Sequence, residues 1–429
     1  MINRGFRGGV LALTLCMIGL VAVATAQTTV RVAVGSVAQE LEVIRASAEA
    51  FERETSIKVE LVPMPSSATE RLALYQQQLG ASSPDIDVYQ IDVVWPGQLG
   101  QFFIDLAPFV SEEERAEFFP RLIENNTVGG RLVALPWFTE TSMLFYRTDL
   151  LEKYGFEAPP ETWDELEAMA RTIQEGERAA GNPNFWGFVW QGASYEGLTC
   201  VALEWVASEG GGTIVDADAN ITINNPNAAR ALARAARWVG GISPPGVTAY
   251  QEEEARGVFQ GGNAAFMRNW TYAIATGNSE GSPIAGKFEV TVLPRGTGDH
   301  ARHAATLGGW QLAVSRFSRQ PQAAAALVEY FTNAETLKMR AIRGAFPPTR
   351  PDLYTDEEIL AAQPFLENMR TILPTAVARP ANVTQTSYNR VSVAFYQAVH
   401  SVLQGRAEPE AALRQLAQQL ERVKGRRGF

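Results

Sequence analysis

The feature that most constrains this fold is an alternation of strand and helix patterns over residues 29–92. Valines recur at every second position in "TTVRVAVGS", and apolar residues recur at helical spacing in "QELEVIRASAEAFERETS". The alternating run "IKVELVP" follows, then a helical stretch from about Ser67 to Leu79, then a third strand pattern. Strands that alternate with helices through short links predict a parallel sheet with right-handed crossovers. This part of the chain is therefore predicted to be α/β.

The third strand pattern ends in residues that suit a hydrophobic core poorly. In "PDIDVYQIDVVWPGQLG", the apolar positions lead to Asp92 and then to Trp95. Glu40, at the start of the first helix, lies at the same predicted edge. Ligands of parallel sheets gather at the carboxyl ends of the strands. We therefore expect a binding site here, with Trp95 either in its wall or in the core beneath it.

The length and charge of the chain limit its class. Because 429 residues exceed what one hydrophobic core usually supports, two lobes are expected. The formal net charge of −10 argues against nucleic acid and anionic membranes as main partners, since both require a basic face. A neutral small ligand is compatible with this charge.

The N-terminus has the pattern of a secretory signal peptide over residues 1–26. Two arginines precede an apolar run of about 14 residues, and Ala24-Thr25-Ala26 is a small-residue cleavage site before Gln27. A retained membrane anchor is the alternative, but a span needs ~20 apolar residues. A lipoprotein signal at Cys16 is disfavoured by Leu15, where a small residue is expected. The mature protein is predicted to be exported to the periplasm or cell surface.

Motifs of common enzymes and metal sites are absent from the sequence. It contains no P-loop, no GxSxG elbow and no HExxH, and its histidines are His300, His303 and His400. The first two lie in "GDHARHAA" without a set of carboxylates at ligand spacing, so we interpret them as loop residues. Cys200 lies in an apolar helical run and is interpreted as a buried small hydrophobe. No cofactor and no metal are expected.

Tryptophans recur beside polar residues at predicted strand ends and turns. The four positions are Trp95, Trp137, Trp270 and Trp310. A sugar presents apolar C–H faces that lie flat on aromatic rings, and hydroxyl edges that need acidic, basic or amide partners. One such tryptophan is most often a half-buried core residue, but four together favour carbohydrate binding.

The later part of the chain adds clear helix and strand signals. Thr162 and Glu165 form a capping-box pattern, "AATLGGWQLAVS" is typical of a strand, and Pro409 begins the last helix. The sequence shows no internal repeat.

The chain resembles the extracellular sugar-binding proteins of bacterial ABC importers, in the maltodextrin-binding-like class and its trehalose/maltose-binding branch. The motifs that carry the resemblance are "PDIDVYQIDVVWPGQL", "LVALPWFTETSMLFYRTDLLEKYG", "PETWDEL", "FQGGNAAFMRNW", "VTVLP", "LGGWQLAVS" and "AVARP". They follow the order of the family and cover essentially the whole mature chain.

The resemblance implies a two-lobed periplasmic-binding-protein fold of the type II kind. Each lobe would be a mostly parallel sheet flanked by helices, with the ligand in the cleft between lobes. The N-terminal lobe would comprise residues 27–137 and 308–350, and the C-terminal lobe residues 138–307 and 351–429.

The resemblance also implies a ligand-binding role for nine positions: Glu40, Arg71, Asp92, Glu140, Trp270, Tyr272, Gly309, Trp310 and Arg379. The carboxylates and arginines would contact sugar hydroxyls, and the aromatic pair of the second lobe would stack on a glucose face. The glycine would let backbone approach the sugar, with the following tryptophan packed beside it. Phe138 departs from the family pattern, where tyrosine is frequent, and leaves the exact ligand open.

The implied function is the binding of an α-glucoside disaccharide such as trehalose, maltose or sucrose, and its delivery to an ABC membrane permease, with the receptor acting as a monomer. Another oligosaccharide is the first alternative. A sugar phosphate is disfavoured, since only Arg71 and Arg379 would face it. A secreted glycoside hydrolase that uses Asp92 and Glu140 as its two carboxylates is the remaining alternative.

Overall fold

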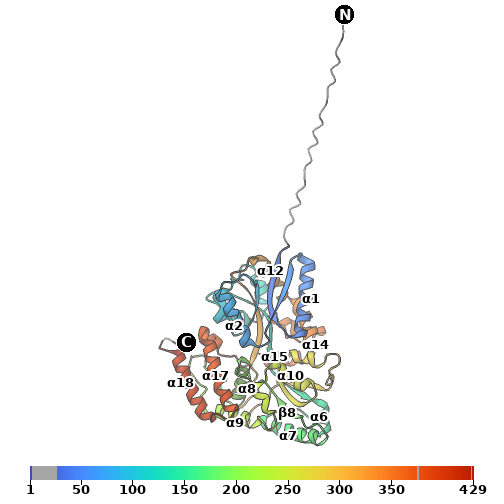
Figure 1. Ribbon diagram of the computed structural model, residues 1–429, viewed down its shortest axis with the longest axis vertical. Coiled ribbons are helices and arrows are strands. Elements are labelled where there is room, and N and C mark those ends of the chain that lie inside the picture. The colour runs from blue at the N-terminus through green and yellow to red at the C-terminus, as the bar shows by residue number, and fades with distance from the viewer. Residues whose placement is uncertain (2–26, 374–375, 427) are drawn as a thin grey trace.

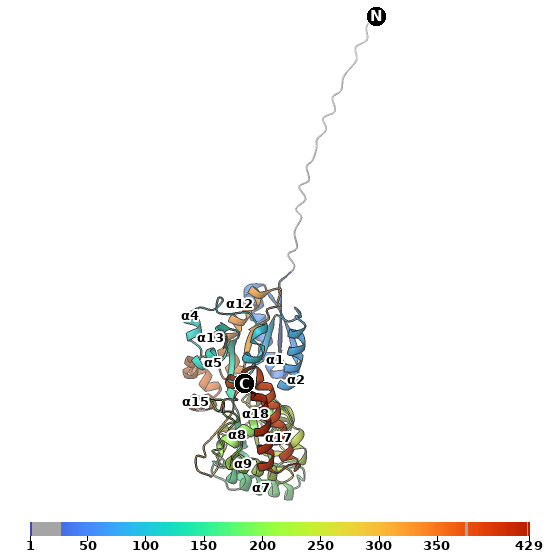
Figure 2. The same cartoon turned by 90° about the vertical axis from the view of Figure 1, so that its left-hand side faces the viewer.

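The computed structural model describes residues 1, 27–373, 376–426 and 428–429. Residues 2–26 of the predicted signal peptide, Cys16 included, lie outside this part. Two lobes are stacked along the long axis, with α1, α2 and α12 in the upper lobe and α6, α7 and α9 in the lower one (Figures 1 and 2). The predicted two-lobed α/β architecture is confirmed.

The upper, N-terminal lobe is built on a five-stranded sheet with the order β2-β1-β3-β11-β6. The strands are β1 (Thr29–Gly35), β2 (Lys58–Met64), β3 (Val88–Asp92), β6 (Leu135–Thr141) and β11 (Leu307–Val314). The main helices are α1 (Ala38–Thr55), α2 (Ala68–Gly80), α12 (Pro321–Thr332) and α13 (Ala334–Gly344). Shorter elements are α3 (Pro96–Leu99), η1 (Gly100–Phe102), α4 (Glu112–Ala116), α5 (Pro120–Asn125) and the hairpin β4 (Thr127–Val128) and β5 (Arg131–Leu132).

The lower, C-terminal lobe is built on a four-stranded sheet with the order β10-β7-β9-β8. The strands are β7 (Met143–Arg147), β8 (Trp186–Val189), β9 (Ala264–Asn269) and β10 (Phe288–Thr291). The helices are α6 (Thr148–Lys153), α7 (Trp163–Ala179), α8 (Glu196–Ser208), α9 (Pro226–Trp238), η2 (Pro245–Ala249), α10 (Glu252–Gln260), α11 (Tyr272–Gly277), α17 (Tyr388–Leu403) and α18 (Pro409–Lys424). Between α13 and α17 lie η3 (Pro351–Thr355), α14 (Glu357–Ala362), α15 (Phe365–Ile372), α16 (Ala381–Thr384) and η5 (Gln385–Ser387).

Each sheet contains one strand that runs opposite to the others, so most strands of each sheet point in the same direction, as the resemblance implied. The pairs β1–β2 and β1–β3 are parallel, but β11 is antiparallel to both β3 and β6. In the second sheet β8–β9 is parallel, whereas β7 is antiparallel to β9 and β10. β7 and β11 are the strands by which the chain enters a lobe from the cleft. They must run away from the cleft, while their neighbours run toward it.

The change of sheet falls slightly later than the predicted boundary at residue 138. β6 continues to Thr141 in the first sheet, and the second sheet begins at Met143. The return strand β11 starts at Leu307, one residue before the return predicted at residue 308. Ser142 and the residues just before Leu307 therefore form two interlobe connections.

Both faces of the first sheet are buried, as expected for an α/β layer. In β1, Val30 and Val32 face one hydrophobic cluster and Ala33 faces another, and all three are fully buried. The predicted capping box of Thr162 and Glu165 is present at the start of α7. None of the helices in the described ranges is long and apolar enough to span a membrane.

Candidate functional site

A single cavity between the lobes is lined by all nine predicted site residues. Its volume is about 110 Å³, well above the ~10–15 Å³ that one water needs. The N-terminal lobe contributes the carboxyl end of β3 and the first turns of α1 and α2, and the C-terminal lobe contributes the starts of α8, α10 and α11. The structure thus brings the nine residues together, as the resemblance implied.

Glu40 is held in place by Gln90, a residue that sequence reasoning missed. The Gln90 amide donates to Glu40 Oε1 at 3.0 Å, and its carbonyl accepts from Gly35 N–H at 2.6 Å. An added Cβ on Gly35 would lie 2.5 Å from Glu40 Oε2, so only glycine leaves room for this carboxylate. Gln90 lies two residues before Asp92 on the same face of β3, and this strand period was the signal that could have found it.

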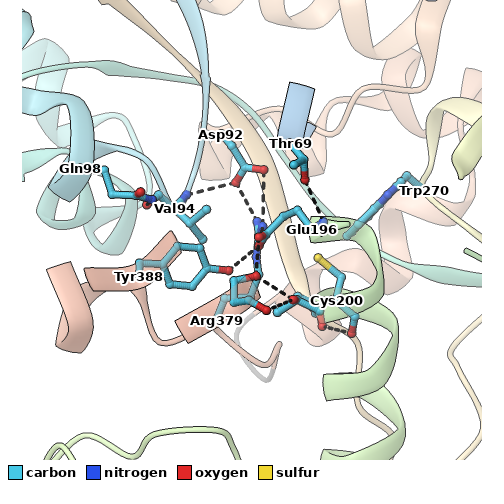
Figure 3. Close-up of polar contacts among 12 residues, drawn as sticks. Thr69, Asp92, Val94, Gln98, Glu196, Cys200, Trp270, Arg379 and Tyr388 are labelled. Carbon is cyan, nitrogen blue, oxygen red and sulfur yellow. Dashed lines mark hydrogen bonds and ion pairs between the residues drawn. The ribbon is translucent and has the colours of Figure 1, made fainter. Parts of the chain in front are cut away.

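Asp92 joins an ion-pair network that spans the two lobes (Figure 3). Arg379 Nη2 donates to Asp92 Oδ1 at 2.8 Å, and Arg379 Nη1 donates to Glu196 Oε1 at 2.8 Å. Val94 N–H also donates to Asp92 Oδ1, at 3.1 Å. Arg379 therefore reaches the cavity as expected, but its guanidinium bridges two carboxylates, one from each lobe.

Glu196, the first residue of α8, is a second residue that the sequence reasoning missed. Its carboxylate accepts from Tyr388 and from Ser392 Oγ, the latter at 2.6 Å, and its backbone N–H donates to Thr69 Oγ1 of the other lobe at 3.0 Å. Burial raises the pKa of Glu196, although Arg379 opposes this shift. No local signal marked it, because most residues of α8 are apolar.

Glu140 lies at the end of β6, where the chain leaves the first lobe. Its Oε2 accepts from Thr271 Oγ1 at 2.9 Å and from Thr271 N–H at 3.3 Å. Burial raises the pKa of Glu140 to about 7, against the opposing effect of these hydrogen bonds. Glu40 raises this pKa further and Arg268 lowers it.

The aromatic wall of the C-terminal lobe is held by two adjacent carboxylates. Tyr272 donates to Glu253 Oε1 at 2.6 Å, and Trp270 Nε1 donates to Glu252 Oε1 at 3.4 Å. Tyr195 donates to the other oxygen of Glu252 at 2.7 Å. Burial raises the pKa of Glu252. Tyr195 and the two glutamates line the cavity and were not predicted.

Arg71 and Trp310 form the opposite wall. The Arg71 guanidinium lies over the Trp310 ring, 4.3 Å from its centroid. Its Nε and Nη2 donate to the Pro65 carbonyl at 3.1 and 3.0 Å, while Nη1 is buried without a partner. Arg71 is therefore a wall residue of the cavity rather than part of a solvated helix face.

Trp95 lies in the core beneath this wall, which answers the open question about its role. It is 2% exposed and packs edge-to-face on Trp310 with ring centroids 5.6 Å apart. Trp137 also lies in the core, so the expectation of a sugar-facing tryptophan there is wrong. In β6 it points opposite to Phe138, which lines the cavity, and it stacks on Phe331.

Two glycines shape the start of β11. Gly309 has φ +128°, and a Cβ there would lie 2.5 Å from the Phe138 carbonyl oxygen, so close strand pairing requires glycine. A Cβ on Gly308 would lie 2.8 Å from the Trp270 ring. Gly308 therefore limits where Trp270 can lie, a constraint that the sequence did not reveal.

The histidines and Cys200, considered in the sequence as metal ligands or nucleophiles, belong to no metal-binding cluster of the described residues. Within the described ranges no three His, Cys, Asp or Glu side chains are placed to hold a metal ion. His303 and His400 contact backbone carbonyl oxygens of Leu293 and Thr248. Cys200 is buried as interpreted, and it also lines the cavity.

Comparisons with known proteins identify the family. Residues 35–338 match the family described as bacterial extracellular solute-binding protein. A probable ABC transporter-binding protein of Deinococcus radiodurans is 52% identical over 398 residues, covering 93% of this chain and 94% of its own length. The solved structure of maltose-bound T. maritima MalE3 superposes with a TM-score of 0.87 at 39% identity, covering 92% of this chain and 100% of that chain.

A further structure shares the fold but binds a different ligand. A solute-binding protein of Thermotoga lettingae in complex with α-D-tagatose has a TM-score of 0.83 at 24% identity, covering 93% of this chain and 100% of that chain. These relatives are binding proteins, so the hydrolase alternative built on Asp92 and Glu140 is wrong. The chain belongs to the family of bacterial extracellular solute-binding proteins and is a binding protein rather than an enzyme.

Proposed function

We propose that this protein binds a neutral α-linked glucose disaccharide, maltose or trehalose, in the interlobe cavity. It acts outside the cytoplasm as a monomer and delivers the sugar to the membrane permease of an ABC importer. The observation that carries the proposal is that tryptophans form the walls of the cavity, beside polar atoms that have no hydrogen-bond partner in the protein. Sucrose, which also contains an α-glucosyl unit, belongs to the same ligand class.

The unpartnered atoms match the edge of a sugar. Among the described residues no protein group hydrogen-bonds Arg71 Nη1, Glu40 Oε2 or Glu140 Oε1. The first donates and the other two accept, as sugar hydroxyls require. Trp270 and Tyr272 take one glucose face, and Trp310 packs beside the sugar.

The ligand class is also supported by the family and by the size of the binding energy. The relative with bound maltose is 39% identical to this chain. A disaccharide has about two dozen heavy atoms, which at roughly −0.3 kcal/mol each gives about −7 kcal/mol. Micromolar affinity corresponds to about −8 kcal/mol. Binding of this order suits a receptor that closes on its ligand and later releases it.

Titration of intrinsic tryptophan fluorescence and calorimetry against maltose, trehalose, sucrose and mannitol test the proposal. We expect micromolar binding of at least one of the three α-glucosides and a tenfold or greater loss in Trp270→Ala. Binding of mannitol but of none of the three α-glucosides would contradict the ligand class. Equal affinity of wild type and Trp270→Ala for the sugar would contradict the site assignment.

A further inference from the structure

A buried ion pair lies directly behind the aromatic wall of the C-terminal lobe. Arg268 of β9 and Glu204 of α8 are each 1% exposed. Arg268 Nη2 and Nε donate to the two Glu204 carboxylate oxygens at 2.5 and 3.0 Å, and Nη1 donates to Gln191 Oε1 at 2.9 Å. The guanidinium is thus held on all three nitrogens in one orientation.

The same carboxylate contacts two of the interlobe connections, the one between β6 and β7 and the one that leads into β11. Glu204 Oε1 accepts from Ser142 Oγ at 2.5 Å, and Ser142 lies between β6 and β7. It also accepts from Thr306 N–H at 3.3 Å, and Thr306 immediately precedes β11. One carboxylate oxygen therefore holds the two points at which the chain passes between the sheets.

The other end of the ion pair holds a cavity wall. The Arg268 guanidinium lies 4.2 Å from the Trp270 ring centroid, and the edge of that ring packs on Gly308, two residues beyond Thr306. A shift of the Trp270 ring away from the cavity, toward Arg268 or Gly308, must therefore displace either Arg268 or the start of β11. Because packed interiors transmit such displacements, the ring and the connections are mechanically linked.

We propose that Arg268 and Glu204 are positioning residues that couple ligand stacking on Trp270 to the relative orientation of the two lobes. The inference deepens the proposed function and rests on it for the identity of the stacked ligand. The coupling itself is a property of the protein and is measurable without any ligand.

The test replaces the pair as a unit. Removing one partner leaves an uncompensated buried charge, whereas replacing both by apolar residues of similar volume usually preserves folding. We therefore combine Arg268→Met with Glu204→Leu. The matched control is Arg234→Met with Glu209→Leu, another buried ion pair of the same lobe that contacts neither connection.

Interlobe distance is measured by double electron–electron resonance between labels at Gln77→Cys and Glu175→Cys, exposed positions on α2 and α7. We expect a broader ligand-free distance distribution in the Arg268/Glu204 variant than in wild type and in the control. With maltose and trehalose, we expect Trp270→Ala to weaken binding at least tenfold in wild type but less than threefold in that background.

Unchanged distance distributions in a folded Arg268/Glu204 variant, or an undiminished Trp270→Ala effect, would overturn the coupling. If no sugar binds wild type, the proposed function fails, while the ligand-free distances still decide the coupling. If the double variant does not fold, Ser142→Ala removes one donor to Glu204 and leaves the cavity lining intact. It should broaden the same distribution, and no broadening would refute the inference.

Discussion

Replacing Glu140 by glutamine should stabilise the ligand-free protein at neutral and alkaline pH. Glu140 is buried, and its carboxylate accepts hydrogen bonds from Thr271 but forms no ion pair among the described residues. Glutamine has the same shape and can still accept from Thr271 through its carbonyl oxygen. The substitution therefore removes a charge and leaves the packing in place.

The magnitude follows from the raised pKa. Burial raises the pKa of Glu140 from 4.5 to about 7. Between these values the unfolded state has lost its proton while the folded state keeps it, so stability falls as pH rises through this window. At about 1.4 kcal/mol per unit, the penalty grows from under ~1 kcal/mol at pH 5 to about 3 kcal/mol at pH 8. Above pH 8 it is constant.

Thermal unfolding of wild type and Glu140→Gln from pH 5 to pH 9 measures this penalty. Subtracting the two curves cancels the titration of the other buried carboxyls. With an unfolding entropy of about 2.1 cal/mol/K per residue over roughly 400 residues, about 3 kcal/mol corresponds to a gain of about 4 °C at pH 8. Glu280→Gln, on an exposed turn, is the matched control for the loss of one carboxylate elsewhere in the protein.

Parallel curves for Glu140→Gln and wild type would refute the reasoning, because the folded carboxyl would then titrate as it does in the unfolded chain. A variant that is less stable than wild type at pH 8 would also refute it. In that case the charged hydrogen bonds from Thr271 would outweigh the cost of burying the carboxylate.

Three further results are expected. Trp270→Ala should weaken disaccharide binding by about 1.5 kcal/mol, or roughly tenfold, with little change in melting temperature. Trp95→Ala should instead lower the free energy of unfolding by about 3–5 kcal/mol. Calorimetry and thermal unfolding separate these effects, and equal losses of stability in the two variants would contradict the assignment of Trp95 to the core. Asp92→Asn should weaken sugar binding at least tenfold, and it should lower the pKa of Glu196, because the Asp92 charge raises that pKa. Carbon-detected NMR titration of the carboxyl groups checks the direction, and an unchanged pKa of Glu196 would contradict this expectation. Disaccharide phosphates should bind at least a hundredfold more weakly than the parent sugars, because six carboxylates and only two guanidinium groups line the cavity. Equal affinities for phosphate and parent sugar in calorimetry would contradict this electrostatic argument.

The elements of the first lobe could be predicted because their signals are local. Period-two valines predicted β1, helical spacing predicted α1 and α2, and the end of β3 at Asp92 followed from its polar residue. The return of the chain at β11 was implied only by the resemblance. Its pairing with β3 joins residues more than two hundred positions apart, and no local pattern encodes that contact.

The site could be predicted only where a residue's type and its strand face agree. Glu140 and Trp137 are three residues apart in β6, yet one lines the cavity and the other stacks in the core. Proximity to polar residues suggested a sugar-facing role for this tryptophan, but the alternation of the strand decides which face it occupies. Glu196 was missed for the converse reason, since a buried carboxylate at the start of an apolar helix has no signal until Arg379 lies beside it.

The inverted strands explain why the site lies where it does. β6 leaves the first lobe at the cleft and β11 returns there, so Glu140 and Gly308 face each other across paired strands at the point of crossing. The strands that end at the cleft deliver Asp92 from one lobe and Asn269, followed by Trp270, from the other. A ligand in this position touches the two lobes and the connections between them at once. The same chain path that divides the protein into lobes therefore also determines that ligand contacts and lobe orientation depend on one another.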